Sequence, residues 1–172
     1  ADVMAAELVH LMSTAARQAI DTRGMFSVAL TGGSSAQALY PVLAQAPLPW
    51  AKVQVFFGDE RCVPPDHVDS NFALADQALL SRVPIPRDNV HRVDGELEPD
   101  VAAARYQATL HSVTGGVLDV VHLGMGPDGH VASLFPGHAL LSSTRLVDSL
   151  SDSPKPPAAR VTLTLRCLAD AR

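Results

Sequence analysis

Short apolar runs alternate along the chain with segments that have helical periodicity. Apolar side chains recur every three or four residues over 4–15, which predicts an amphipathic helix near the start of the chain. A second helix is predicted over 36–44. Another is expected to begin at a cap formed by Asp69 or Ser70 and to end at Leu80. A fourth is predicted over 99–111, where a proline in the first turn is tolerated.

Mostly apolar runs predict strands over 25–30, 53–57, 117–123 and 161–165, and further strands are predicted over 89–93 and 145–147. Strands that alternate with helices indicate a mostly parallel central sheet with helices on both faces. The predicted fold class is therefore α/β, with three layers. The 172 residues suffice for one domain with its own core, and neither a linker nor an internal repeat divides them. We therefore predict a single domain over 1–172.

Charge and cysteine content narrow the class of partner. The formal net charge is −5 and no basic stripe is present, which argues against a nucleic acid partner. No apolar run approaches the roughly 18 residues that suggest a membrane span. Cys62 and Cys167 lie far apart without metal-ligand spacing, and no H-x-x-x-H pair occurs, so no metal is expected. Free cysteines favour a reducing, cytoplasmic location.

A glycine-dense turn follows the predicted strand at 117–123 and reads GMGPDGH over 124–130. Its last residues include Asp128 and His130, two positions apart. Histidine is the usual general base near neutral pH, and a neighbouring carboxylate can fix its tautomer. Water is a simpler nucleophile than Ser133, because no G-x-S-x-G nucleophile elbow is present. The alternative is a structural loop with a surface histidine, but the density of Gly, Pro, Asp and His favours a catalytic pair.

A second turn, Thr31-Gly32-Gly33-Ser34, joins a predicted strand to a predicted helix. Free backbone N–H groups and the helix dipole suit such a turn to an anion, although it matches neither G-x-G-x-x-G nor a Walker A sequence. An ordinary strand-to-helix turn is the alternative. Arg61, after the strand at 53–57, could clamp a phosphate or belong to a surface salt-bridge cluster. Arg160 could be a second phosphate ligand or a charge at a strand end.

Together these segments resemble the 6-phosphogluconolactonase family, within the glucosamine-6-phosphate isomerase/deaminase superfamily. The resemblance covers nearly the whole chain, in the family's order. The motifs that carry it are TGGS (31–34), GDERCVP (58–64), DSN (69–71), GMGPDGHVASLFP (124–136), SDSPKPP (151–157) and RVTLT (160–164). The two longest are highly specific, whereas the first glycine turn alone is not.

The resemblance implies a Rossmann-like sandwich and hydrolysis of 6-phospho-D-glucono-1,5-lactone in the oxidative pentose phosphate pathway, without metal or organic cofactor. By position, His130 would be the general base that activates water, and Asp128 would orient it. The substrate would be bound by Thr31, Gly32, Gly33, Ser34, Arg61 and Arg160. The expected partner is a phosphorylated sugar lactone, with no nucleic acid and no membrane, and the expected state is a monomer or a weak homodimer.

Other functions stay open from the sequence. The first alternative is an amino-sugar phosphate isomerase/deaminase. Deaminases typically have an Ala-Phe-Asn-Glu-Pro-like sequence after the Asp-Gly-His core, whereas this chain has Ala132-Ser133-Leu134-Phe135-Pro136, which disfavours that branch. A non-catalytic sugar-phosphate-binding module and an unrelated doubly wound domain are the others. Family members usually extend further, so the resemblance also implies that this chain lacks the family's C-terminal part and its first strand.

Overall fold

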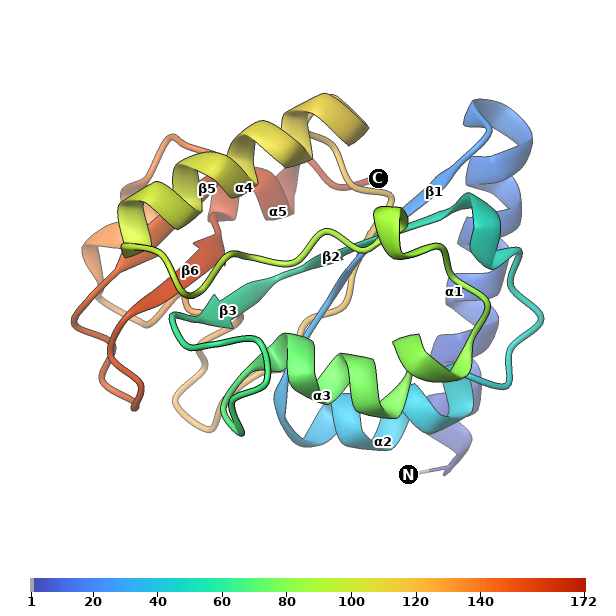
Figure 1. The fold of residues 1–172 in the computed structure, drawn as a ribbon, viewed down its shortest axis with the longest axis horizontal. Coiled ribbons are helices and arrows are strands. Elements are labelled where there is room, and N and C mark those ends of the chain that lie inside the picture. Colours follow the sequence, from blue (N-terminus) through green and yellow to red (C-terminus); the bar gives the residue numbers. More distant parts are fainter. Residues whose placement is uncertain (1) are drawn as a thin grey trace.

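A computed structural model describes residues 2–172, with side chains from Met4 onward. A parallel sheet lies between two layers of helices, and a second, antiparallel sheet packs against one of these layers (Figure 1). The helices are α1 (Asp2–Arg23), α2 (Gly33–Leu43), α3 (Asn71–Ala78), α4 (Pro99–Thr114) and α5 (Leu165–Ala169). The strands are β1 (Phe26–Leu30), β2 (Val53–Phe57), β3 (Asp59–Arg61), β4 (Val120–Val121), β5 (Val147–Leu150) and β6 (Arg160–Leu163). Short 3₁₀ turns are η1 (Trp50–Lys52), η2 (Leu80–Arg82), η3 (Arg87–Asn89) and η4 (Ala139–Ser142).

The first sheet is parallel, in the order β2-β1-β4. Side chains alternate across it because successive residues of a strand face opposite sides. Val28 and Leu30 of β1 pack in a core beneath α1, α2 and α3, whereas Ala29 packs in a second core beneath α4. In Figure 1, α2 and α3 lie below β1 and β2, and α4 and α5 lie above them. The predicted α/β class with a parallel sheet covered on both faces is confirmed.

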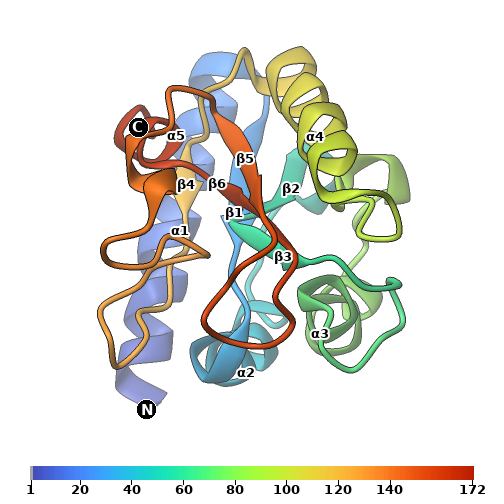
Figure 2. The same ribbon diagram turned by 90° about the vertical axis from the view of Figure 1, so that its left-hand side faces the viewer.

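The second sheet is antiparallel, in the order β3-β6-β5, and was not predicted (Figure 2). The predicted strands at 145–147 and 161–165 exist as β5 and β6, shifted by a few residues, and Leu165 instead begins α5. The strand β3 consists of Asp59, Glu60 and Arg61, which a local apolar pattern cannot identify. β3 follows β2 after a single residue and pairs with β6, about a hundred residues later in the sequence. The second sheet is therefore attached at the end of β2.

The strand predicted at 89–93 is wrong. The 3₁₀ turn η3 occupies 87–89, and only Val90 forms a bridge, with Val55 of β2. The strand predicted at 117–123 is shorter, since only Val120 and Val121 form ladder pairs with β1. Among residues 2–172, no helix has both the length and the apolarity needed to cross a bilayer.

Glu60 connects the second sheet to α3. Its carboxylate accepts hydrogen bonds from the backbone N–H groups of Asn71 (2.7 Å) and Phe72 (2.8 Å), and from the Ser70 hydroxyl (3.1 Å). Ser70, one of the two residues predicted as the cap, is the N-cap of α3. Its hydroxyl accepts a hydrogen bond from the backbone N–H of Ala73. Burial raises the pKa of Glu60, and the N–H donors oppose that rise. These bonds fix the start of α3, and with it Asn71, beside β3.

Tyr106 of α4 holds the end of β2. Its buried hydroxyl accepts a hydrogen bond from the backbone N–H of Phe57 (2.6 Å) and donates one to the Phe57 carbonyl (3.1 Å). Tyr106→Phe is expected to lower the free energy of unfolding by about 1–3 kcal/mol, because it leaves a buried N–H without its partner. Urea unfolding monitored by circular dichroism measures this. An unchanged midpoint would show that Phe57 finds another partner.

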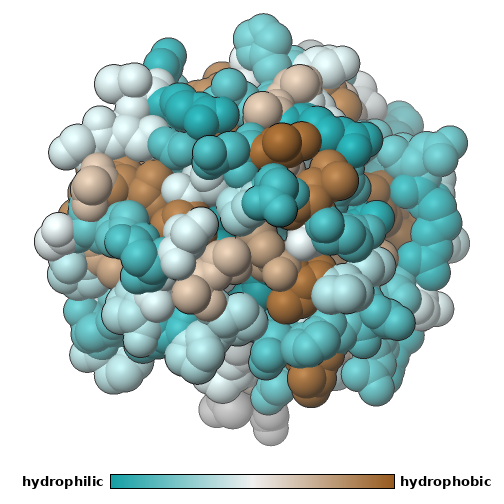
Figure 3. Space-filling view, turned by 60° about the vertical axis from the view of Figure 1, so that its left-hand side comes forward, coloured by the Kyte–Doolittle hydropathy of each residue, from teal (hydrophilic) through white to brown (hydrophobic). Residues whose placement is uncertain are grey.

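On the face drawn in Figure 3, hydrophobic and hydrophilic side chains are interspersed. The apolar residues on this face form small separate patches rather than one broad surface of the kind that marks an interface.

Candidate functional site

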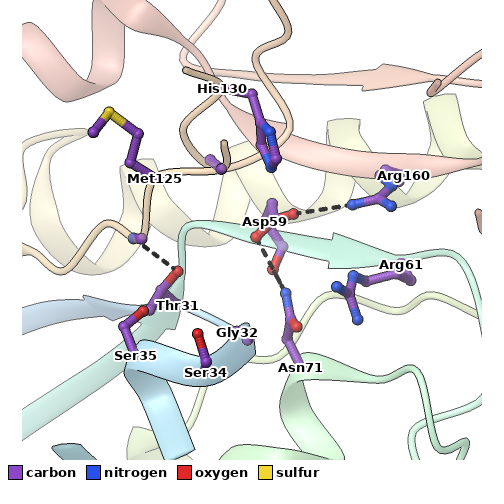
Figure 4. Close-up of a pocket in the computed structure, with 14 residues that line it drawn as sticks. Thr31, Gly32, Ser34, Ser35, Asp59, Arg61, Asn71, Met125, His130 and Arg160 are labelled. Atoms are coloured by element: carbon purple, nitrogen blue, oxygen red, sulfur yellow. Dashed lines mark hydrogen bonds and ion pairs between the residues drawn. The ribbon is translucent and has the colours of Figure 1, made fainter. Parts of the chain in front are cut away.

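A cavity of about 170 Å³ lies where the strands of the parallel sheet end and the loops after them converge. Ligands of open α/β sheets bind at this carboxyl edge. Figure 4 shows its walls: Thr31 and Ser35 on one side, Arg61 and Arg160 on the other, and His130 above Asp59. The cavity is lined by Thr31, Gly32, Gly33, Ser34, Ser35, Asp59, Arg61, Asn71, Gly124, Met125, Gly126, His130, Ala132 and Arg160. Every predicted site residue except Asp128 is in this set.

The turn between β1 and α2 places the first turn of that helix at the cavity. Gly32 is the N-cap of α2, and no side chain caps the helix there. A Cβ on Gly32 would lie 1.9 Å from Oδ1 of Asn71, so only glycine lets the turn and α3 approach so closely. The hydroxyl of Thr31 accepts a bond from the Gly124 N–H (3.3 Å), which joins this turn to the loop of His130. The free N–H groups suit an anion.

A buried polar network forms the floor of the cavity. The Asp59 carboxylate accepts hydrogen bonds from the Ser133 hydroxyl (2.7 Å) and the Asn71 amide (3.1 Å), and lies 3.8 Å from Nη1 of Arg160. All four side chains are almost fully buried. Sequence reasoning assigned no role to Asp59 or Asn71, although the motifs GDERCVP and DSN contain them. Ser133 lies behind Asp59, outside the lining, so it positions the carboxylate.

The two arginines differ in how much of their hydrogen-bonding capacity is used. Arg160 donates to the carbonyls of Pro157 (3.0 Å), Lys155 (3.0 Å) and Pro156 (3.2 Å). Burial lowers the pKa of Arg160, and the Asp59 carboxylate opposes that shift. Because the ordinary pKa of an arginine side chain lies far above neutrality, the guanidinium stays charged. Arg61 donates to the Asp69 carbonyl (2.5 Å), and its buried Nε has no partner among the described residues. Arg61 therefore has donors to spare for a ligand.

His130 and Asp128 form a pair at the rim of the cavity. Nδ1 of His130 lies 2.6 Å from Oδ1 of Asp128. This hydrogen bond lowers the pKa of Asp128 to about 2, and a hydrogen bond from Lys155 makes a smaller contribution to that shift. Asp128 is thus ionised at neutral pH. A neutral imidazole that donates from Nδ1 carries its lone pair on Nε2. Figure 4 shows the ring directed into the cavity, so this lone pair can accept a proton there.

Two neighbours restrict the His130 ring. The Phe135 ring packs against it with the centroids 4.7 Å apart. A Cβ on Gly126 would lie 2.1 Å from Cε1 of His130, 2.2 Å from Nδ1 and 2.6 Å from Oδ1 of Asp128. The glycine at 126 thus leaves the space in which the pair sits. Among the residues described, no three His, Cys, Asp or Glu side chains are grouped so that they could hold a metal ion.

Comparisons with known proteins place the chain in a family. The family model described as "Glucosamine-6-phosphate isomerases/6-phosphogluconolactonase" matches residues 1–172. The "Probable 6-phosphogluconolactonase 3, chloroplastic" of Oryza sativa subsp. indica is 42% identical, over 95% of this chain and 55% of its own length. The "6-phosphogluconolactonase" of Mycobacterium bovis is also 42% identical, over 99% of this chain and 74% of its own.

The solved structures agree with the sequence matches. The crystal structure of 6-phosphogluconolactonase from Thermotoga maritima superposes with a TM-score of 0.89, at 36% identity, over 97% of this chain and 76% of that one. The chain spans about half the length of the curated rice relative and three quarters of the Thermotoga chain. The fold, the motifs and these matches show that the chain belongs to the family of glucosamine-6-phosphate isomerases and 6-phosphogluconolactonases.

Proposed function

We propose that the chain hydrolyses 6-phospho-D-glucono-1,5-lactone to 6-phospho-D-gluconate, the second step of the oxidative pentose phosphate pathway. The observation that carries this proposal is the 2.6 Å pair of His130 and Asp128, which shares one cavity with Arg61 and the first turn of α2. The names of the Mycobacterium and Thermotoga relatives support the same substrate. The free thiols of Cys62 and Cys167 favour the cytoplasm as its location.

In the proposed reaction, Nε2 of His130 takes a proton from water, and the water oxygen attacks the C1 carbonyl of the lactone. Negative charge passes to the carbonyl oxygen, where N–H groups of the 31–34 turn or an arginine stabilise it. The bond between C1 and the ring oxygen then breaks, and the ring oxygen takes the proton back from the imidazolium. Asp128 fixes the tautomer of His130 and stabilises its charged form.

We assign the substrate phosphate to Arg61 and the first turn of α2. Arg61 has unused donors, and Gly33 and Ser34 begin the helix at the cavity. A guanidinium fork and helix N–H groups both favour a phosphate. Arg160, whose donors mostly bind backbone carbonyls, is assigned to the sugar hydroxyls together with Asp59.

Arg61→Ala is expected to raise KM for the lactone about 10- to 100-fold and to change kcat much less, because a charge-assisted contact to the phosphate is equal in the ground and transition states. Steady-state kinetics over a wide substrate range measure both constants. Arg82→Ala, which removes an exposed arginine of η2, is the matched control. A fall in kcat with unchanged KM would remove Arg61 from phosphate binding.

Initial rates with freshly generated lactone, corrected for spontaneous opening, test the proposed function. The wild-type chain is expected to accelerate the opening and to release no ammonia from glucosamine 6-phosphate. Ammonia release would favour the isomerase/deaminase. Binding of 6-phosphogluconate without acceleration would favour a non-catalytic sugar-phosphate-binding module.

A further inference from the structure

Lys155 contacts both members of the catalytic pair from a distant part of the chain. Its Nζ lies 3.1 Å from Oδ1 of Asp128 and 3.3 Å from Nδ1 of His130. The Nδ1 atom of His130 and the ammonium therefore meet the same carboxylate oxygen. Nδ1 of His130 donates its proton to that oxygen and so cannot also accept a hydrogen bond from the ammonium. The ammonium therefore acts on the imidazole as a neighbouring positive charge.

The backbone of Lys155 is held in place by buried groups. The hydroxyl of Ser153 donates to the Lys155 carbonyl (2.8 Å) and accepts from the Lys155 N–H (3.2 Å). Arg160, which lines the cavity, donates to the same carbonyl (3.0 Å). The segment that carries Lys155 is thus fixed to the cavity wall, and its side chain has a defined reach to the pair.

Charge balance gives this contact a consequence. With Asp128 alone, a neutral His130 leaves the pair with a charge of −1, and protonation of the ring neutralises it. With the ammonium of Lys155 present, the neutral ring completes a group of zero net charge, and protonation creates an excess positive charge. Opposite charges within about 4–6 Å favour the charged form of a titratable group, and like charges disfavour it. Asp128 can therefore orient the imidazole without holding it protonated.

We propose that Lys155 is a positioning residue that offsets the charge of Asp128 and so keeps His130 available as a base at neutral pH. This role rests on the proposed function, in which His130 deprotonates water. The other charged side chains that line the cavity with His130 are Asp59, Arg61 and Arg160. Phe135, which packs against the ring, carries no charge. None of these is altered when Lys155 is replaced, so a comparison of variants isolates its contribution.

Titration of the His130 ring by NMR tests this directly, without substrate. The Cε1–H resonance, assigned by its loss in His130→Gln, is expected to titrate about one pH unit higher in Lys155→Met than in the wild type. Lys155→Arg keeps the charge and is expected to stay close to the wild type. Lys52→Met removes the other lysine, in η1 at the far end of β2, and is expected to change nothing. An unshifted resonance in Lys155→Met would overturn the proposal.

The pH–rate profile gives a second readout. In Lys155→Met, the acidic limb of kcat/KM for lactone opening is expected to move to higher pH by a similar amount, so that the loss of rate is greatest at acid pH. A merely structural role would lower the rate evenly across pH, which would contradict the proposal. Absence of lactone opening in the wild type would instead sink the proposed function, while the NMR titration would still decide the role of Lys155.

Discussion

His130→Ala is expected to lower kcat for lactone opening about 10²- to 10⁴-fold, the usual contribution of a positioned general base. KM is expected to change much less, because the phosphate is assigned to Arg61 and the first turn of α2 rather than to His130. The residual rate comes from bound substrate and from the groups that stabilise the carbonyl oxygen. Steady-state kinetics corrected for spontaneous opening measure the effect.

His10→Ala is the matched control, because His10 is an exposed residue of α1. Its kinetics are expected to equal those of the wild type. Thermal unfolding of both variants separates loss of the base from loss of the fold. Near-wild-type turnover in His130→Ala would remove the general-base assignment, and the water would then need another activating group.

Gly126→Ala is expected to lower kcat about 100-fold with little change in stability. The new methyl group would lie 2.1 Å from Cε1 of His130, a distance that real contacts do not allow, so the imidazole must move. A displacement of about 1 Å of a catalytic group can cost 10²-fold in rate. The rate constant and the Tm, measured on the same preparation, show whether the effect is on the site or on the fold.

Gly58→Ala is the matched control for this substitution. A Cβ there would make only ordinary contacts, 3.5 Å from the Leu30 carbonyl oxygen and 3.9 Å from Leu123. Wild-type turnover in Gly126→Ala would mean that the loop adjusts without displacing His130, and that this glycine has no role in positioning the base.

Local sequence pattern was sufficient for the elements whose signals are local. β2 coincides with the predicted 53–57, because an almost wholly apolar run of that length is typical of a strand buried on both faces. α4 begins at the predicted Pro99, since proline at the first helical position is preorganised for the helix. The strand at 89–93 was wrong because only Val90 pairs with a neighbouring strand, at Val55 of β2.

The second sheet could not be predicted from local pattern. β3 is charged throughout, and the burial of its acids depends on partners outside the strand: Asn71 and Phe72 for Glu60, and the distant Ser133 and Arg160 for Asp59. The periodicity of apolar residues along the sequence carries no information about such hydrogen bonds and ion pairs. The same limit applies to the cavity. Motifs identified His130, Arg61 and the 31–34 turn, but Asn71 enters only because Glu60 fixes the start of α3.

Lys155 shows this limit most clearly. It lies within the SDSPKPP motif, yet nothing in the sequence places it beside Asp128, 27 positions earlier. Its place depends on Ser153 and Arg160, which hold the turn against the cavity wall. Chemistry-bearing residue types were recognisable from the sequence, whereas the distances between them required the fold.

A crystal structure with 6-phosphogluconate bound tests the central claim most directly. The claim is that His130 activates water at C1 of a substrate whose phosphate is held by Arg61 and the first turn of α2. The C1 carboxylate is expected within about 3–3.5 Å of Nε2 of His130, with the phosphate at Arg61 and the first turn of α2. A product bound with its phosphate at His130 and its carboxylate at Arg61 would contradict the account.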